Sequence, residues 1–210
     1  MNPSHSGSRQ WYNNAGTTPD AFRRYLPSEG SMDRSNQYER AFEAYLQHRR
    51  LCFVAVDETN RSLADDEAIK SLDFIVHGTS GAGFLVDVKG RRFPGGPPGR
   101  QRRVWECWST LEDIDGLDRW GETFGPGYRG LLVFAYRLGK EVTLPNETED
   151  LWDYRGWRFL FRAVPVADYR KEMHLRSPKW RTVTLPRAAF RRLVRPLSHF
   201  TEQWAVSRGQ

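Results

Sequence analysis

Two apolar segments joined by a glycine-rich stretch constrain the fold of this chain more than any other feature. Residues 71–76 (SLDFIV) and 83–89 (GFLVDVK) favour strands, and the HGTSGAG between them suits a hairpin turn. Each segment carries one acidic residue among apolar ones, Asp73 in the first and Asp87 in the second. Because a hairpin sets its strands side by side, we expect the two carboxylates to lie close together.

The second segment also carries a lysine on the same face as its carboxylate. Side chains alternate between the faces of a strand, so Asp87 and Lys89 project together with Leu85. The opposite face is apolar and consists of Phe84, Val86 and Val88. A lone D-x-K triplet is a weak signal, because such triplets more often mark a strand end. Its combination with Asp73 and with an acidic helix favours a site.

That helix is predicted from Asn36 to about Arg50. Apolar residues recur there at helical spacing, at Tyr38, Ala41, Phe42, Tyr45 and Leu46. Glu39 and Glu43 lie one turn apart on one edge of the helix. Glu39 is the candidate that completes the acidic site, and Glu43 is a candidate for support.

The rest of the chain predicts alternating strands and helices. Further strands are expected at 52–56, 104–108, 130–136, 156–164 and 181–185, and further helices at 110–124, 167–173 and 186–194. Thr110 is a candidate N-cap and Gly125 a C-terminal stop. Residues 57–70 read as a loop, and the Pro/Gly/Arg stretch 90–103 as irregular. The order of elements predicts a mixed α/β layer fold.

Composition sets the class of protein and of partner. Lys and Arg number 32 against 26 Asp and Glu, a net charge of +6, which is compatible with a polyanionic partner. We expect a cytoplasmic protein that binds no membrane, because no apolar run approaches the ~20 residues of a span and the N-terminus lacks a signal-peptide core. Two cysteines form no disulfide framework, and motifs of nucleotide-driven motors, α/β-hydrolases and dinucleotide enzymes are missing.

Four arginines are candidates for contacts to nucleic-acid phosphates. Arg91 and Arg92 follow Lys89 directly, and Arg102 and Arg103 lie in the next loop. The neighbouring Trp105 and Trp108 would stack on unpaired bases or belong to the core. For the arginines, a solvated loop is the alternative.

The acidic pair and the lysine suit phosphodiester hydrolysis. Asp73 and Asp87 would hold Mg²⁺ or Mn²⁺, which polarises a phosphate and acidifies a bound water. Lys89 would stabilise the developing charge or position the attacking water, and Glu39 would support the metal–water shell.

This order of residues resembles the PD-(D/E)XK nuclease superfamily, nearest to the archaeal-type Holliday-junction resolvases. YERAFEAYLQHRR resembles their first helix, LDFIV their P-D strand with Leu72 replacing the proline, and FLVDVKGRR their E-x-K strand with Asp87 replacing the glutamate. The likeness covers residues 36–164. It implies a restriction-endonuclease-like α/β core, a mixed central sheet flanked by helices, with Glu39, Asp73, Asp87 and Lys89 as its catalytic residues.

A narrower resemblance is to the uncharacterised HYExAFE family, whose motif stands here as QYERAFE. That likeness implies no activity, but it suggests that Glu39 and Glu43 both matter. We divide the chain into a disordered basic and polar tail (1–34), a nuclease-like core (35–164) and an extension packed on the core (165–210). The leading hypothesis is a Mg²⁺-dependent endodeoxyribonuclease of structured DNA, with a homodimer implied by the resolvase likeness. The alternative is an inactive module that binds nucleic acid or a protein.

Overall fold

The computed structural model describes residues 37–56, 63–64, 67–68, 72–78, 81–97, 99–145 and 147–202. The predicted tail 1–34 lies outside these residues. The helices are α2 (Gln37–His48), α3 (Leu111–Phe124), α4 (Val166–Glu172), α5 (Arg187–Leu193) and α6 (Leu197–Thr201). Four of them confirm the predicted helices to within a few residues, and α6 was not predicted. No helix in the described part of the chain is long and apolar enough to cross a membrane.

A seven-stranded mixed sheet forms the centre of the protein. Its strands follow one another across the sheet as β1 (Cys52–Ala55), β4 (Phe74–His77), β5 (Gly83–Phe93), β7 (Tyr128–Leu138), β9 (Trp157–Pro165) and β12 (Arg195–Pro196), with β8 (Leu151–Tyr154) paired to β9. Only the β5–β7 pairing is parallel among these, and α3 supplies the crossover between the two strands. β6 (Ser109–Thr110), β10 (His174–Ser177) and β11 (Thr182–Thr184) form a small second sheet.

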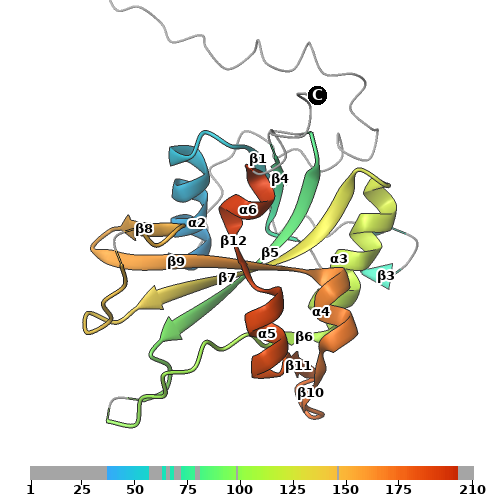
Figure 1. Ribbon diagram of the computed structural model, residues 1–210. Coiled ribbons are helices and arrows are strands. Elements are labelled where there is room, and N and C mark those ends of the chain that lie inside the picture. The colour runs from blue at the N-terminus through green and yellow to red at the C-terminus, as the bar shows by residue number, and fades with distance from the viewer. Residues whose placement is uncertain are drawn as a thin grey trace, which may run out of the picture.

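Helices cover both faces of the central sheet (Figure 1). On one face, Phe42 of α2 and Leu197 of α6 pack against Val86 and Val88 of β5. On the other face, α3, α4 and α5 pack against Leu85 and its neighbours. The alternation predicted for residues 84–89 is therefore correct, and so is the mixed α/β fold with a central mixed sheet flanked by helices.

The strand β5 is longer than predicted. Gly90–Phe93 were assigned to an irregular stretch, but they continue β5 in parallel register with β7 as far as the pair Phe93 and Leu138. The reason lies in β7, which is equally long and offers a backbone partner to each of these residues. Only the part of the Pro/Gly/Arg stretch beyond Phe93 leaves the sheet.

The strand predicted at 104–108 is wrong. Residues 102–110, which we call the return segment, run back past β5, where Trp105 stacks on Phe93 at 3.6 Å and Trp108 contacts Arg91. The segment crosses the face of the sheet, because Trp105 contacts the side chains of Phe93 in β5 and of Tyr136 in β7, and so it adds no strand to an edge of β5. Side chains satisfy its carbonyls instead: the Tyr136 hydroxyl donates to Glu106 O at 2.9 Å, the Tyr169 hydroxyl to Cys107 O at 2.7 Å, and Arg91 to Trp108 O.

Shorter elements also depart from the predictions. The predicted loop 57–70 contains a two-strand pair, β2 (Leu63–Ala64) with β3 (Glu67–Ala68), and its other residues lie outside the described chain. β8, β10 and β12 were not predicted either. Asp73 lies one residue before β4 and not within it. After Pro165, Val166, Tyr169 and Phe190 join one core and β12 pairs with β9, while the domain boundaries at 34 and 164 stay a prediction.

Replacing Gly90 with alanine is expected to destabilise the protein by about 1–3 kcal/mol. A Cβ there would lie 2.4 Å from Cδ2 of Tyr38, so the Tyr38 ring or the first turn of α2 must shift away from β5. Gly121→Ala in α3 is the control, because nothing lies within 4 Å of its added Cβ. That control should gain about 0.5–1 kcal/mol from helix propensity. Urea denaturation measures both changes, and a Gly90→Ala protein as stable as the wild type would contradict the close packing of α2 on β5.

Candidate active site

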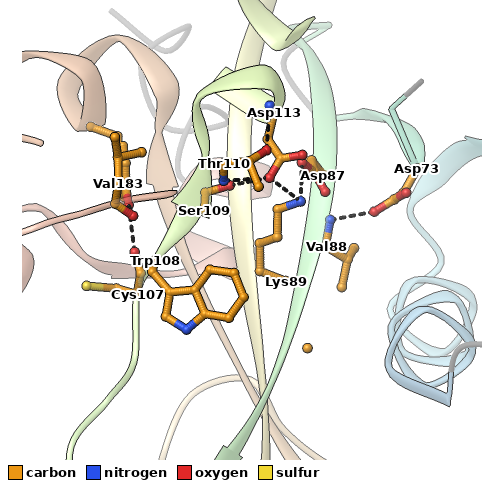
Figure 2. Close-up of polar contacts among 12 residues, drawn as sticks. Asp73, Asp87, Val88, Lys89, Cys107, Trp108, Ser109, Thr110, Asp113 and Val183 are labelled. Atoms are coloured by element: carbon orange, nitrogen blue, oxygen red, sulfur yellow. Dashed lines mark hydrogen bonds and ion pairs between the residues drawn. The ribbon is translucent and has the colours of Figure 1, made fainter. Parts of the chain in front are cut away.

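Lys89 of β5 lies between two carboxylates (Figure 2). Its Nζ is 2.7 Å from Oδ2 of Asp87 and 2.8 Å from Oδ2 of Asp113, and the Lys89 side chain is only 15% exposed. Burial alone would lower the pKa of Lys89, but the two carboxylates raise it above its ordinary value. Lys89 is therefore a fixed cation, and it joins β5 to the start of α3.

Asp113 is the site residue that sequence reasoning missed. It forms a capping box with Thr110 at the N-terminus of α3: its Oδ2 accepts the Thr110 N–H at 2.9 Å, and its own N–H donates to Thr110 Oγ1 at 3.1 Å. The Ser109 hydroxyl also donates to Oδ2, at 2.7 Å. The capping role was visible as a Thr110 followed by an acid three residues later. The contact with Lys89 depends on the tertiary fold and leaves no local signal.

Asp73 approaches β5 from the β4 side. Its side chain is buried, and Oδ2 accepts the Val88 N–H at 2.6 Å. Burial raises the pKa of Asp73 well above its usual value, and the nearby carboxylates of Asp87 and Glu39 raise it further. The Val88 N–H and Lys89 oppose this shift without cancelling it. The fold thus brings three predicted acids, from α2, β5 and the start of β4, within electrostatic reach of one another.

The packing of α2 sets where Glu39 lies. Tyr38 covers Gly90 of β5 and contacts Phe159 of β9 edge-on at 5.9 Å between ring centroids. Glu39 is the next residue, in the first turn of α2, and is partly buried. Glu43 follows one turn later and is also partly buried.

The acids do not form a closed metal cage. Within the described residues, no three His, Cys, Asp or Glu side chains are grouped so that they could hold a metal ion. Figure 2 shows Asp87 beside Lys89 and Asp113, and Asp73 on the far side of the Val88 backbone. Any cation here would have to be held by one or two carboxylates and by oxygens of other kinds.

Of the four candidate phosphate-binding arginines, Arg91 is buried and serves the fold. Its guanidinium lies 3.9 Å from the Trp108 ring centroid and donates to the carbonyls of Gly90 and Trp108. Arg92, Arg102 and Arg103 are exposed. The exposed Arg92, Arg102 and Arg103 remain candidates for phosphate contacts. Arg91 instead holds the return segment through its contacts with Trp108.

Comparisons with known proteins find similarity in structure and none in sequence. No protein-family model and no curated protein matches the chain. Among solved structures, the fold is similar to Hjc, a Holliday junction resolvase from the archaeal hyperthermophile Archaeoglobus fulgidus. The TM-score is 0.45 at 11% identity, over 79% of this chain and 93% of that chain. At these values the similarity supports no conclusion about activity or substrate.

Lys89→Met should destabilise the protein by about 3–5 kcal/mol at pH 7, because it leaves two buried carboxylates without their cation. Lys171→Met is the matched control: Lys171 pairs with Asp168 at 3.2 Å, and 72% of its side chain is exposed. The control should change stability little, since exposed pairs contribute little. Equal losses in the two variants, measured by urea denaturation, would show that Lys89 is not an essential link between β5 and α3.

Asp73→Asn is expected to become more stable than the wild type as pH rises. The raised pKa means that folded Asp73 binds its proton more tightly than the unfolded chain does, so wild-type stability falls from about pH 4 up to the folded pKa. The slope is at most about 1.4 kcal/mol per pH unit for one proton. Asparagine keeps an oxygen for the Val88 N–H and cannot ionise.

Denaturation of both proteins across pH in EDTA measures this difference. Asp153→Asn is the control, because the Asp153 side chain is 75% exposed in its pair with Arg158. The stability of this variant relative to wild type should not rise with pH. If Asp73→Asn loses stability relative to wild type as pH rises, the charged form of Asp73 is favoured by the fold and our interpretation is wrong.

Proposed function

We propose that this protein is a metal-dependent, endonuclease-like hydrolase of nucleic-acid phosphodiesters, with structured DNA as its favoured substrate. The observation that carries the proposal is the meeting of Asp73, Asp87 and Lys89 around residues 87–89 of β5, with Glu39 close enough to affect Asp73. A buried acid whose pKa is raised by neighbouring carboxylates is unfavourable for folding alone, and such acids concentrate at functional sites.

The oxygens near Asp73 fit a hard divalent cation. The β4–β5 pairing ends at Phe74 and Val86, so Val88 meets the Asp73 side chain, not a β4 backbone group, on that edge of β5. The N–H and the C=O of one strand residue point to the same edge of the strand. The Val88 carbonyl therefore faces the same edge as the Val88 N–H that Asp73 accepts, and its oxygen could join the carboxylates of Asp73 and Asp87 as a ligand. Mg²⁺ keeps several waters and needs only one or two protein carboxylates, in agreement with the lack of a three-acid cluster among the described residues.

Each residue has a role that follows from its position. Asp73 and Asp87 would hold Mg²⁺ or Mn²⁺, which supplies Lewis-acid polarisation of the phosphate and a more acidic bound water. Lys89 holds a fixed positive charge beside Asp87 and would stabilise the negative charge that develops on the phosphate oxygens. Glu39 would orient water, with Glu43 in support. The exposed Arg92, Arg102 and Arg103 would bind flanking phosphates.

Membership of the PD-(D/E)XK superfamily is part of this proposal. The chain order of acidic helix, acid before β4, D-x-K on β5, crossover helix α3 and parallel strand β7 matches the order that the sequence resemblance implied. Membership of the narrower HYExAFE family rests on the QYERAFE motif alone. A homodimer, which two cuts in a branched DNA would require, is part of this proposal.

One observation favours the second candidate, an inactive nuclease-fold module that binds nucleic acid or a protein. The ammonium of Lys89 is already held by Asp87 and Asp113 at 2.7 and 2.8 Å. A lysine that serves only to join β5 to α3 would have the same contacts. Cleavage assays separate the two candidates.

Wild-type protein with Mn²⁺ or Mg²⁺ should cleave branched, nicked or linear DNA, and Asp73→Asn should reduce the rate at least about 100-fold. Because Asp73→Asn is expected to be at least as stable as wild type at neutral pH, its loss of activity could not be ascribed to unfolding. Asp153→Asn, with the same charge change on an exposed position of β8, should cleave normally. If wild type cuts none of these substrates but binds them with salt-sensitive affinity, the inactive module is the better description.

Metal binding has its own readout. Mn²⁺ at 100 times Kd should raise the free energy of unfolding of wild-type protein by about 2.7 kcal/mol, so the thermal midpoint should rise with the logarithm of the Mn²⁺ concentration. Asp87→Asn should abolish most of this rise, and Asp153→Asn should retain it. Equal midpoints in EDTA and in excess Mn²⁺ would contradict Asp73 and Asp87 as metal ligands.

A further inference from the structure

A cavity of about 730 Å³ lies between the return segment, the ends of β7 and β9, β11 and α5. Its size is within the range of small-molecule sites. The apolar part of its wall consists chiefly of Trp105, Tyr136, Leu160, Leu185, Phe190 and Val194. Trp108 of the return segment also lines it. Aromatic walls of this kind are suited to a flat ring.

The charged part of the wall is almost entirely positive. Six arginines line the cavity against the single carboxylate of Glu106, and they are Arg102, Arg103, Arg162, Arg176, Arg187 and Arg191. Across the described chain, none of the six forms an ion pair: Arg162 donates to the carbonyls of Glu149 and Phe161, and Arg176 lies over the Trp108 ring at 5.0 Å. The Glu106 carboxylate accepts the Trp108 indole N–H at 3.3 Å. The cavity therefore combines aromatic surface with an excess of positive charge.

The return segment joins the arginine-lined cavity to β5. Arg91 of β5 contacts Trp108 and Phe93 stacks on Trp105, and both tryptophans line the cavity. Lys89, Arg91 and Phe93 project from one face of β5, and at about 3.3 Å per residue Phe93 lies about 13 Å from Lys89. Because the return segment covers Arg91 and Phe93, a strand that reaches from Lys89 to the cavity would pass over this segment.

We propose that the arginine-lined cavity binds a single unpaired nucleotide of the strand whose phosphodiester is presented to Asp87 and Lys89. The base packs against the aromatic wall, and its phosphate is bound by arginines at the rim, where Arg187 and Arg191 of α5 are exposed. The inference rests on the proposed function, because it assigns the substrate an unpaired nucleotide beside the cleaved bond. A nuclease with this D-x-K site and this net charge could lack such a cavity, so the cavity is a separate feature of the protein.

The test measures binding of a short fluorescein-labelled single-stranded oligonucleotide in EDTA, where cleavage is suppressed. Arg187→Ala/Arg191→Ala should weaken binding about tenfold or more at physiological salt. The slope of log K against log salt should become shallower by about 0.7, because the two arginines neutralise one phosphate of a single strand. The matched control is Arg192→Ala/Arg195→Ala, which removes the same charge from neighbouring residues that do not line the cavity. An equal loss in both double variants would overturn the proposal in favour of a general basic surface.

A second arm tests for the base. Oligonucleotides in which each nucleotide in turn is made abasic should include one position that weakens binding to wild type about fivefold or more. In Arg187→Ala/Arg191→Ala the same position should have a smaller effect. If no abasic position weakens binding, the cavity binds phosphate only and the proposal fails.

A third arm identifies the source of the nucleotide. Free deoxyadenosine monophosphate should compete only weakly with the oligonucleotide, and inorganic phosphate should not compete. Competition by the free nucleotide at the affinity of the oligonucleotide would overturn the assignment to a nucleic-acid strand. Binding that follows these expectations without cleavage contradicts the hydrolase function alone, and cleavage with unaltered binding in Arg187→Ala/Arg191→Ala contradicts this inference alone.

Discussion

The ammonium of Lys89 holds together the two parts of the structure on which everything else depends. It is the cation between Asp87 of β5 and Asp113 at the start of α3, and all three side chains have little exposure. α3 is the crossover from β5 to β7, so this contact fixes where the crossover begins. A buried group of this kind is costly to desolvate and stable only when its hydrogen bonds are complete. The capping box and Ser109 complete them on the Asp113 side.

The two ends of the same lysine-centred cluster therefore differ in character. Asp113 accepts hydrogen bonds from Ser109 and Thr110 and belongs to the architecture of a helix end. Asp73, beyond Asp87, is a buried acid whose neighbours Asp87 and Glu39 make its ionised form less favourable. A fold that needed only stability would gain by placing an amide at Asp73. Under the proposed function, this carboxylate would serve metal binding at a cost to stability.

Local sequence patterns predicted those features that local rules govern. Two-residue alternation placed Asp87 and Lys89 on one face of β5, and Thr110 followed by Asp113 marked the start of α3. Features that depend on partners far along the chain were missed. Gly90–Phe93 form a strand because β7 pairs with them. Val104–Trp108 do not, because this segment crosses the face of the sheet, where Trp105 packs on Phe93 and Tyr136. The role of Arg91 was hidden for the same reason, because its partner Trp108 lies in a segment that only the tertiary fold brings back.

The cavity and the acidic site carry charge of opposite sign. In the acidic site, Asp87 and Asp113 flank Lys89, and Asp73 accepts the Val88 N–H. In the cavity, six arginines face one glutamate. Under the proposed function, a phosphodiester strand would be attracted to the arginines and repelled by the carboxylates until a divalent cation offsets them. Binding in the cavity would hold the strand and metal binding would admit the phosphate to Asp87, which supplies a physical reason for cleavage to require the metal even after the strand is bound.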